Sequence, residues 1–200
     1  QLVKSKNDII KLINKSFNAG HSPLDRMALF KDRIWHFKRD KNIKSIFGLF
    51  KGLVRLFIPT KFERLTTKEV GYVYFQKFIP NNKFDIRIII IGDRAFAIKR
   101  NVRSGDFRAS GSGIIEYDKE LIDKRCIEIS FNISNKLNFN SMAYDYVFDN
   151  LNNPLLVEIS YCYSHLAYYD CPGYWDNNLN WNEGSFKSPD FMVQDIIKKI

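Results

Sequence analysis

Residues 84–100 have the sequence FDIRIIIIGDRAFAIKR, and this stretch decides the fold of the chain. Two largely apolar runs flank Gly92-Asp93, a dipeptide that is typical of a two-residue hairpin turn of the primed type. If Ile91 pairs with Arg94, the alternation of side chains along each strand defines two faces. The predicted polar face carries Asp85, Arg87, Ile98 and Arg100, and the predicted core face carries Phe84, Ile86, Ile88 and Ile90.

A second hairpin is predicted around the six-residue loop Asp149–Pro154. If Phe148 pairs with Leu155, Asp145 lies directly opposite Glu158. Two facing carboxylates destabilise a strand pair, but a shared Mg²⁺, which prefers oxygen ligands, would turn the pair into a binding site. Two arginines and two carboxylates on rigid strands therefore indicate a site that handles phosphate through a divalent metal. The structural alternatives are an ordinary cross-strand ion pair and two carboxylates that face solvent.

The rest of the chain predicts an α+β fold, an antiparallel sheet with flanking helices. The expected elements are a helix over 6–17, short helices and loops over 21–70, a strand over 72–79, a loop over 101–113, a helix from Asp118 to about Leu137, and a closing helix over 189–200. Residues 46–58 are apolar apart from Lys51 and Arg55. They form either an amphipathic surface helix or a helix that is buried or covered by a partner, and the second interpretation is preferred.

Composition narrows the class of protein. The 200 residues carry a net charge of +9 and 15% aromatic side chains, which excludes a disordered chain and favours anionic partners. The three cysteines have no CxxC spacing, so we expect free thiols in a reducing compartment and a cytoplasmic localisation. No apolar run approaches the roughly 20 residues that span a bilayer, so no membrane span is expected. Nothing in the residues indicates an oligomeric state.

Five motifs follow one another in a familiar order between residues 71 and 161: YVYFQKFIP at 72–80, DIR at 85–87, AIKR at 97–100, Asp145, and EIS at 158–160. This order resembles that of the ATP-grasp ligases, and most closely the branch that contains the glutamate ligase of a ribosomal protein. Glutathione synthetase and D-alanine–D-alanine ligase are more distant relatives. The resemblance implies a partial N-terminal ATP-grasp subdomain over 1–70 and a C-terminal subdomain over 71–200, with a hinge strand at 71–80.

The resemblance also implies an activity. In that family ATP phosphorylates a carboxylate, and an amine or another nucleophile then displaces phosphate from the acylphosphate. ATP and Mg²⁺ are the implied cofactors, and the implied partners are ATP, a carboxylate substrate and a nucleophile rather than nucleic acid. The roles carried over by position are adenine binding for Gln76, Lys77, Phe78, Ile79 and Leu156, the last on the face of Glu158; metal binding for Asp145, Glu158 and Ser160; and catalysis, by stabilising the transferred phosphoryl group, for Arg87 and Arg100.

Two departures from the family pattern are visible. Ser160 stands where the family usually has asparagine, two residues after the metal-binding glutamate. Residues 1–70 contain no equivalent of the phosphate-gripping lysine and glycine-rich flap, and Gln1-Leu2-Val3 resembles the strand that follows that flap. We therefore interpret the chain as mostly the C-terminal portion of an ATP-grasp protein and expect this portion alone to be a poor catalyst.

Two other classes of function remain open at this point. The basic first third, with its Phe, Tyr and Trp residues, suits a nucleic-acid-binding module, which would bind in a strongly salt-dependent way and ignore Mg-ATP. A non-catalytic relative that keeps the fold and scaffolds another protein would bind no nucleotide.

Overall fold

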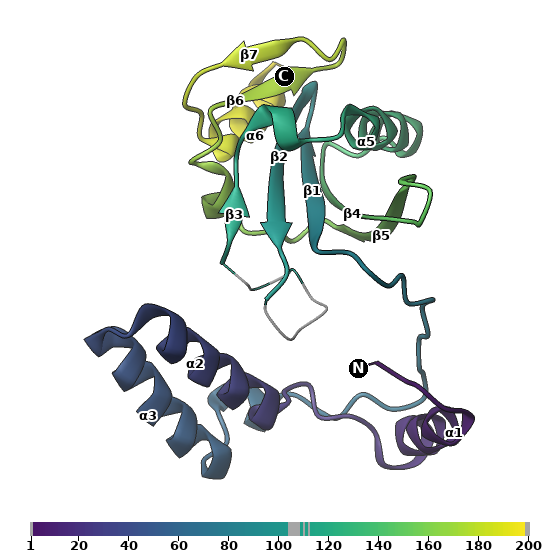
Figure 1. Ribbon diagram of the computed structural model, residues 1–200, viewed down its shortest axis with the longest axis vertical. Helices are drawn as coiled ribbons and strands as arrows, with labels where there is room; N and C mark the ends of the chain where they lie inside the picture. The colour runs from purple at the N-terminus through teal and green to yellow at the C-terminus, as the bar shows by residue number, and fades with distance from the viewer. Residues whose placement is uncertain (1, 104–108, 110, 112, 199–200) are drawn as a thin grey trace. The chain divides into compact units, whose positions relative to one another are not determined.

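The computed structural model describes residues 2–103, 109, 111 and 113–198 (Figure 1). The chain forms two compact units, Gln1–Phe78 and Ile79–Ile200. The first unit is helical, and the second contains the sheet. Most of the loop predicted over 101–113 lies outside the described residues.

The first unit consists of α1 (Lys6–Asn14), a π-helical turn (Lys15–Ala19), α2 (Arg26–Asp40), α3 (Ile43–Phe57) and α4 (Lys61–Leu65). A polar side chain caps the N-terminus of each α-helix by accepting a backbone N–H: Ser5, Asp25, Asn42 and Thr60. Lys41 ends α2 in the left-handed conformation, with φ of 45°, so that α3 begins almost at once. The helices α2 and α3 therefore form a helical hairpin.

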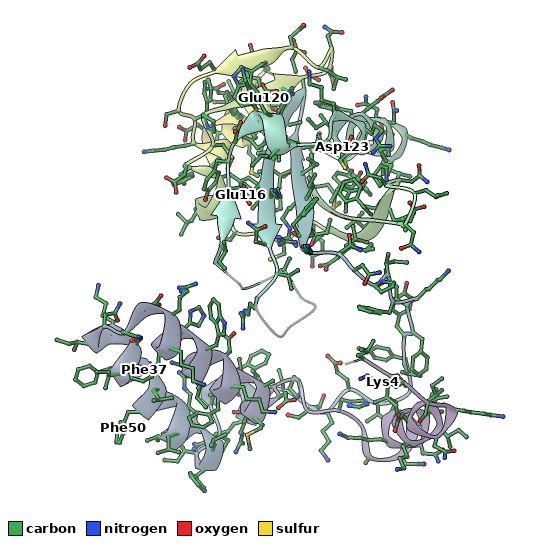
Figure 2. The ribbon with its side chains drawn as sticks, viewed as in Figure 1. Lys4, Phe37, Phe50, Glu116, Glu120 and Asp123 are labelled. Atoms are coloured by element: carbon green, nitrogen blue, oxygen red, sulfur yellow. The ribbon has the colours of Figure 1, made fainter. Side chains whose placement is uncertain are left out.

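The prediction for residues 21–70 is wrong in one respect, because α2 and α3 are each 15 residues long rather than short. The preferred interpretation of residues 46–58 was a helix that is buried or covered by a partner. Burial within the chain is wrong for the outer face of α3, and coverage by a partner stays a prediction. Phe47, Phe50 and Phe57 of that face are exposed in the described part of the chain. Figure 2 labels Phe50 on α3. Basic residues such as Lys31, Lys38 and Arg39 weaken the apolar periodicity of α2, which is why the sequence suggested irregular structure there.

The second unit contains one antiparallel sheet of seven strands, in the order β5-β4-β1-β2-β6-β7, with β3 paired to β2 (Figure 1). The strands are β1 (Phe84–Ile91), β2 (Arg94–Asn101), β3 (Ile115–Glu116), β4 (Ser141–Phe148), β5 (Pro154–Ser160), β6 (Gly173–Asp176) and β7 (Trp181–Glu183). The helical elements are η2 (Lys119–Leu121), α5 (Lys124–Leu137), η3 (His165–Tyr168) and α6 (Ser188–Ile197). The predicted α+β class, an antiparallel sheet with flanking helices, is confirmed.

The central hairpin has the predicted register. Ile91 pairs with Arg94, and Asp85 pairs with Arg100 at the other end. Gly92 has φ of 54°, a left-handed conformation that glycine adopts without strain at the first position of a primed turn. The turn therefore fixes which side chains of β1 and β2 share a face.

Both faces of the sheet are covered. On one face, Ile86, Ile88 and Ile90 pack with residues of α5, including Ile127 and Phe131. On the other face, the apolar half of the strands packs under η3 and α6 in a cluster of Ile89, Ile91, Phe96, Ile98, Ala143, Tyr168 and Cys171. Because period-two alternation continues along β1, Asp85 and Arg87 lie on this second face, beyond the apolar cluster.

Two predicted elements differ from the structure. Residues 72–79 contain no strand, and their aromatic side chains are largely exposed, because aromatic and β-branched content alone does not supply a pairing partner. The helix expected from Asp118 is interrupted. Asp118 caps only the short helix η2, and Asp123 caps α5.

Candidate active site

Four charged side chains meet on the second face of the sheet, and the strand register brings them together. Asp85 of β1 pairs with Arg100 of β2, and Arg87 of β1 pairs with Asp145 of β4. Arg87 donates from Nε and Nη2 to the two carboxylate oxygens of Asp145, both at 2.5 Å. Arg100 donates to both oxygens of Asp85 at 2.6 Å and from Nη2 to Asp145 Oδ2 at 2.9 Å. We call these four residues the arginine–aspartate cluster.

The arginine–aspartate cluster is removed from water. Asp85, Arg100 and Asp145 are all buried, and Arg87 is partly buried. Burial raises the pKa of Asp85, and the hydrogen bond from Arg100 opposes this shift. Burial favours the neutral form of each arginine, yet the pKa of Arg87 and of Arg100 is raised because their carboxylate partners stabilise the cations. The two guanidinium groups therefore stay charged, and each is paired with a carboxylate within the sheet.

Glu158 lies opposite Asp145, as predicted, but the register of the hairpin near its loop differs from the predicted register. Phe148 pairs with Pro154 rather than with Leu155, and an irregularity beside Tyr146 then shifts the register by one residue. Such a β-bulge inserts one extra residue into one strand. The predicted pairing of Phe148 was wrong by one residue, and the bulge shifts the register by one residue in the compensating direction. Asp145 and Glu158 therefore still lie opposite each other.

The bulge changes the expected position of Leu156. It pairs with Tyr146, whereas Glu158 pairs with Asp145, and neighbouring residues of β4 point to opposite faces. The prediction that Leu156 shares a face with Glu158 is therefore wrong in this register, because the extra residue breaks the two-residue alternation.

The two remaining metal candidates have different surroundings. The Glu158 side chain is exposed and makes no hydrogen bond or ion pair with any described residue. The hydroxyl of Ser160 donates to the carbonyl oxygen of Cys162 at 3.0 Å and accepts its backbone N–H at 3.3 Å. Ser160 is thus engaged in a local turn, and Glu158 is available.

No group of three or more His, Cys, Asp or Glu side chains suited to a metal occurs among the described residues. Asp145 and Glu158 are two carboxylates, and a carboxylate offers about four lone-pair positions. Described N–H groups occupy three of these positions on Asp145, one on Oδ1 and two on Oδ2. One lone-pair position on Oδ1 is left without a described donor.

Of the predicted adenine-binding residues, Leu156 lies on β5, and the other four lie outside the sheet. Gln76, Lys77 and Phe78 end the first unit, and Ile79 begins the second. The side chains of Gln76, Lys77 and Phe78 are exposed, and that of Ile79 is half-buried.

Tyr168 was not predicted from the sequence as a residue of the site. This side chain, from η3, is buried in the apolar cluster beside Cys171, and its hydroxyl makes no hydrogen bond to any described residue. Burial raises the pKa of Tyr168 well above its usual value, and the charges of Arg87 and Arg100 oppose this shift. The phenol therefore lies within electrostatic reach of the arginine–aspartate cluster. No periodic signal in the sequence marks its segment.

Replacement of Tyr168 by phenylalanine is expected to raise the free energy of unfolding by about 1 kcal/mol, since a buried hydroxyl without a partner costs stability. Urea unfolding measures this change. The matched control is Tyr144→Phe, because Tyr144 is equally buried and its hydroxyl lies 2.6 Å from that of Ser134. The control is expected to lose about 1 kcal/mol. Equal losses in the two variants would contradict the unpaired state of Tyr168.

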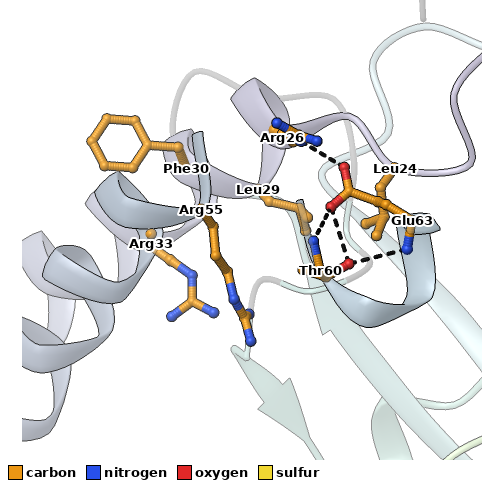
Figure 3. A pocket seen from close by; sticks show the side chains of 9 residues that line it. Leu24, Arg26, Leu29, Phe30, Arg33, Arg55, Thr60 and Glu63 are labelled. Carbon is orange, nitrogen blue, oxygen red and sulfur yellow. Dashed lines mark hydrogen bonds and ion pairs between the residues drawn. The ribbon is translucent and has the colours of Figure 1, made fainter. Parts of the chain in front are cut away.

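Two cavities lie elsewhere, and no predicted site residue lines either of them. A cavity of about 120 Å³ lies between α2, α3 and α4, beside Arg26 and Glu63 (Figure 3). An open cavity of about 1030 Å³ lies between the β1–β2 turn, the end of α5, and α6. The smaller cavity is bordered by a polar network in which Arg26 donates to Glu63 at 2.6 Å and Thr60 N donates to the same carboxylate at 2.7 Å.

This network predicts an acid-sensitive first unit. The hydrogen bond from Arg26, followed by that from Thr60 N, lowers the pKa of Glu63 from 4.5 to about 2. A carboxyl group with a lowered pKa in the folded state stabilises the fold above its unfolded pKa, and this stability is lost as the pH falls through the folded value. We expect Glu63→Gln to remove part of the loss of stability between pH 4.5 and 2. Acid unfolding monitored by tryptophan fluorescence measures this change. Glu128→Gln, on the exposed side of α5, should leave the pH profile unchanged.

A family model described as the RimK-like ATP-grasp domain matches residues 41–164, which is more than half of the chain. The chain belongs to this family. The match spans the strands that carry the arginine–aspartate cluster and Glu158. No curated protein matches the chain.

Membership of the RimK-like ATP-grasp family assigns the chain to a family of ATP-dependent ligases. The resemblance drawn from the five motifs is thereby confirmed at the level of the family. Within the described residues, no helix is long and apolar enough to cross a membrane.

Proposed function

We propose that this protein is an ATP- and Mg²⁺-dependent ligase that joins a carboxylate to an amine, or to a similar nucleophile, through an acylphosphate. The family supports the ligase class. The observation that carries the finer proposal is the pairing of Asp145 with Glu158 beside two arginines on neighbouring strands. The first unit would then form part of an N-terminal ATP-grasp subdomain, and the second unit the C-terminal subdomain.

The proposed reaction has two steps. A carboxylate oxygen of the substrate attacks the γ-phosphorus of ATP, an O–P bond forms, and the bond from that phosphorus to the ADP oxygen breaks. The amine then attacks the acyl carbon, a C–N bond forms, phosphate leaves with the electrons of the C–O bond, and the nitrogen loses a proton. Both steps gather negative charge on phosphoryl oxygens, so positioning and charge stabilisation dominate the catalysis.

Arg87 and Arg100 suit that requirement, because a guanidinium is a planar donor that stays charged when buried. Each guanidinium is held at two points by a carboxylate, so it cannot turn away as the charge of the substrate develops. Asp145 and Glu158 would hold Mg²⁺, and Mg²⁺ when bound neutralises phosphate charge. Ser160 is a weaker candidate ligand because its hydroxyl already bonds with Cys162.

For adenine we propose the backbone of Gln76, Lys77, Phe78 and Ile79. Leu156 is also partly exposed and available for packing against a base. Its bulged strand would have to turn this side chain toward the face of Glu158.

One observation favours a second candidate, a non-catalytic scaffold of the same family. Arg87 and Arg100 together occupy three of the lone-pair positions of Asp145, which is the arrangement of a purely structural ion pair. In such a protein the arginine–aspartate cluster would stabilise the sheet and bind no nucleotide.

Calorimetric titration of Mg-ATP into the protein separates the two candidates. The ligase predicts saturable binding that EDTA abolishes, because Asp145 and Glu158 would hold Mg²⁺ and the bound ion would neutralise phosphate charge. The scaffold predicts no heat of binding with or without the metal. Binding of ATP that is indifferent to EDTA would contradict the proposed role of Asp145 and Glu158.

A further inference from the structure

The helix α3 carries an unusual apolar stripe on its outer side. Seven large apolar side chains at three- and four-residue spacing are between 39 and 78% exposed: Ile43, Ile46, Phe47, Phe50, Leu53, Val54 and Phe57. Residues at this spacing lie on one face of a helix. We call this set the α3 stripe. Contiguous exposed apolar surface on this scale marks a site of interaction rather than ordinary surface.

The opposite side of α3 is already used for packing on α2. Arg33 of α2 donates to the carbonyl oxygen of Gly48 at 2.9 Å. A Cβ atom added at Gly52 would lie 2.5 Å from Arg33 Cδ and 3.1 Å from a ring atom of Phe30. Gly52 thus permits close approach of the helices, and the α3 stripe faces away from α2.

The charge around the α3 stripe is strongly positive. The helix α3 contains Lys44, Lys51 and Arg55 and no acidic residue. Because these three are separated by seven and four residues, they lie along one flank of the helix. The helical hairpin, residues 26–58, has nine basic and two acidic residues, whereas the whole chain has a net charge of +9. Most of the excess charge of the protein is therefore concentrated on this hairpin.

We propose that the α3 stripe docks on a membrane surface that contains anionic lipids. An apolar face rich in phenylalanine, flanked by basic residues, is the composition of helices that lie in the lipid interface. Anionic headgroups would complement the charge of the hairpin, and the phenylalanines would enter the boundary between headgroups and acyl chains. The helix would lie along the membrane rather than cross it, in keeping with its 15 residues.

The same charge argues against a second copy of this chain as the occupant. A symmetric dimer through the α3 stripe would place two strongly basic hairpins side by side, since an isologous interface pairs the same surface of both chains. Their repulsion would oppose the apolar contact.

Sedimentation with vesicles tests this proposal on the intact chain. We expect binding to phosphatidylcholine vesicles with about one third phosphatidylglycerol, and little binding to phosphatidylcholine alone. The double variant Phe47→Ser/Phe57→Ser should bind the anionic vesicles about a hundredfold more weakly, since each buried phenylalanine contributes about tenfold or more. The variant Lys44→Gln/Lys51→Gln should bind them about 25-fold more weakly, about fivefold for each lysine.

A matched control distinguishes binding through the α3 stripe from nonspecific binding through other exposed apolar side chains. Phe17 and Phe62 are each 54% exposed in the same unit but lie outside the stripe, so Phe17→Ser/Phe62→Ser should retain vesicle binding. Equal binding by the stripe variant and by the wild type would overturn the proposal. So would failure of the wild type to bind anionic vesicles, including the case in which it self-associates through Phe47 and Phe57 in analytical ultracentrifugation.

Discussion

Replacement of Arg100 by methionine is expected to lower the free energy of unfolding of the second unit by about 3–5 kcal/mol. Arg100 is buried and donates to both Asp85 and Asp145. Its removal leaves the Asp85 carboxylate buried without a compensating charge. This free-energy cost is larger than the net contribution of the ion pair to stability. The reason is that the desolvation penalty of the buried carboxylate is offset only by its charged partner.

The loss in Arg100→Met should depend on pH in a defined direction. Burial raises the pKa of Asp85, and Arg100 opposes this shift in the wild type. Without Arg100 the pKa of Asp85 rises further. A carboxyl group with a raised pKa in the folded state binds more protons folded than unfolded, so stability falls as the pH rises above the ordinary aspartate value of 3.8. The variant should therefore be least impaired in mild acid, which urea unfolding at several pH values measures.

Two further variants make this result interpretable. Asp85→Asn combined with Arg100→Met removes the uncompensated charge and should recover part of the lost stability. Arg125→Met removes an exposed arginine that pairs with Asp123, and it should cost no more than about 1 kcal/mol. If Arg100→Met is as mild as Arg125→Met, the arginine–aspartate cluster does not hold the sheet together.

The central hairpin could be predicted from sequence because its information is local. Gly92 fixes the turn, the turn fixes the register, and the period of two assigns every side chain of β1 and β2 to a face. The pairing of Arg87 with Asp145 was beyond this argument, because it depends on β4 lying next to β1. No local pattern orders strands that are separated by more than 50 residues.

The errors have physical causes of the same kind. The bulge in β5 could not be anticipated, because no glycine or proline marks Val157, and it moved Leu156 relative to Glu158. Tyr168 was not predicted because it belongs to the short helix η3, which lies in a stretch of sequence without apolar periodicity. Residues 72–79 have the composition of a strand but no strand partner in the structure. In all three cases the structure depends on contacts between segments that are distant in the sequence.

Replacement of Glu158 by glutamine is expected to weaken the binding of Mg-ATP by about a hundredfold, if the carboxylate is a metal ligand. Loss of a residue that merely supports a ligand already costs about 10–100-fold in metal affinity. A glutamine keeps the size of the side chain but not the charge that attracts Mg²⁺. Because Glu158 is exposed and has no described partner, its substitution should change the free energy of unfolding by no more than about 0.5 kcal/mol.

This separation of binding from stability makes Glu158 a sharper probe than Asp145. Any change at Asp145 also breaks its bonds with Arg87 and Arg100, so a loss of nucleotide binding there would not distinguish a ligand from a structural residue. The control for Glu158→Gln is Glu183→Gln on β7, another exposed carboxylate on a strand, which should leave Mg-ATP affinity unchanged. Calorimetric titration measures both affinities, and Mn²⁺ binding followed by electron paramagnetic resonance reports the metal directly. Undiminished Mg-ATP and Mn²⁺ affinity in Glu158→Gln would remove Glu158 from the metal site, whereas a wild-type protein that binds neither Mg-ATP nor Mn²⁺ would leave the arginine–aspartate cluster as a structural ion-pair network, which is the scaffold interpretation.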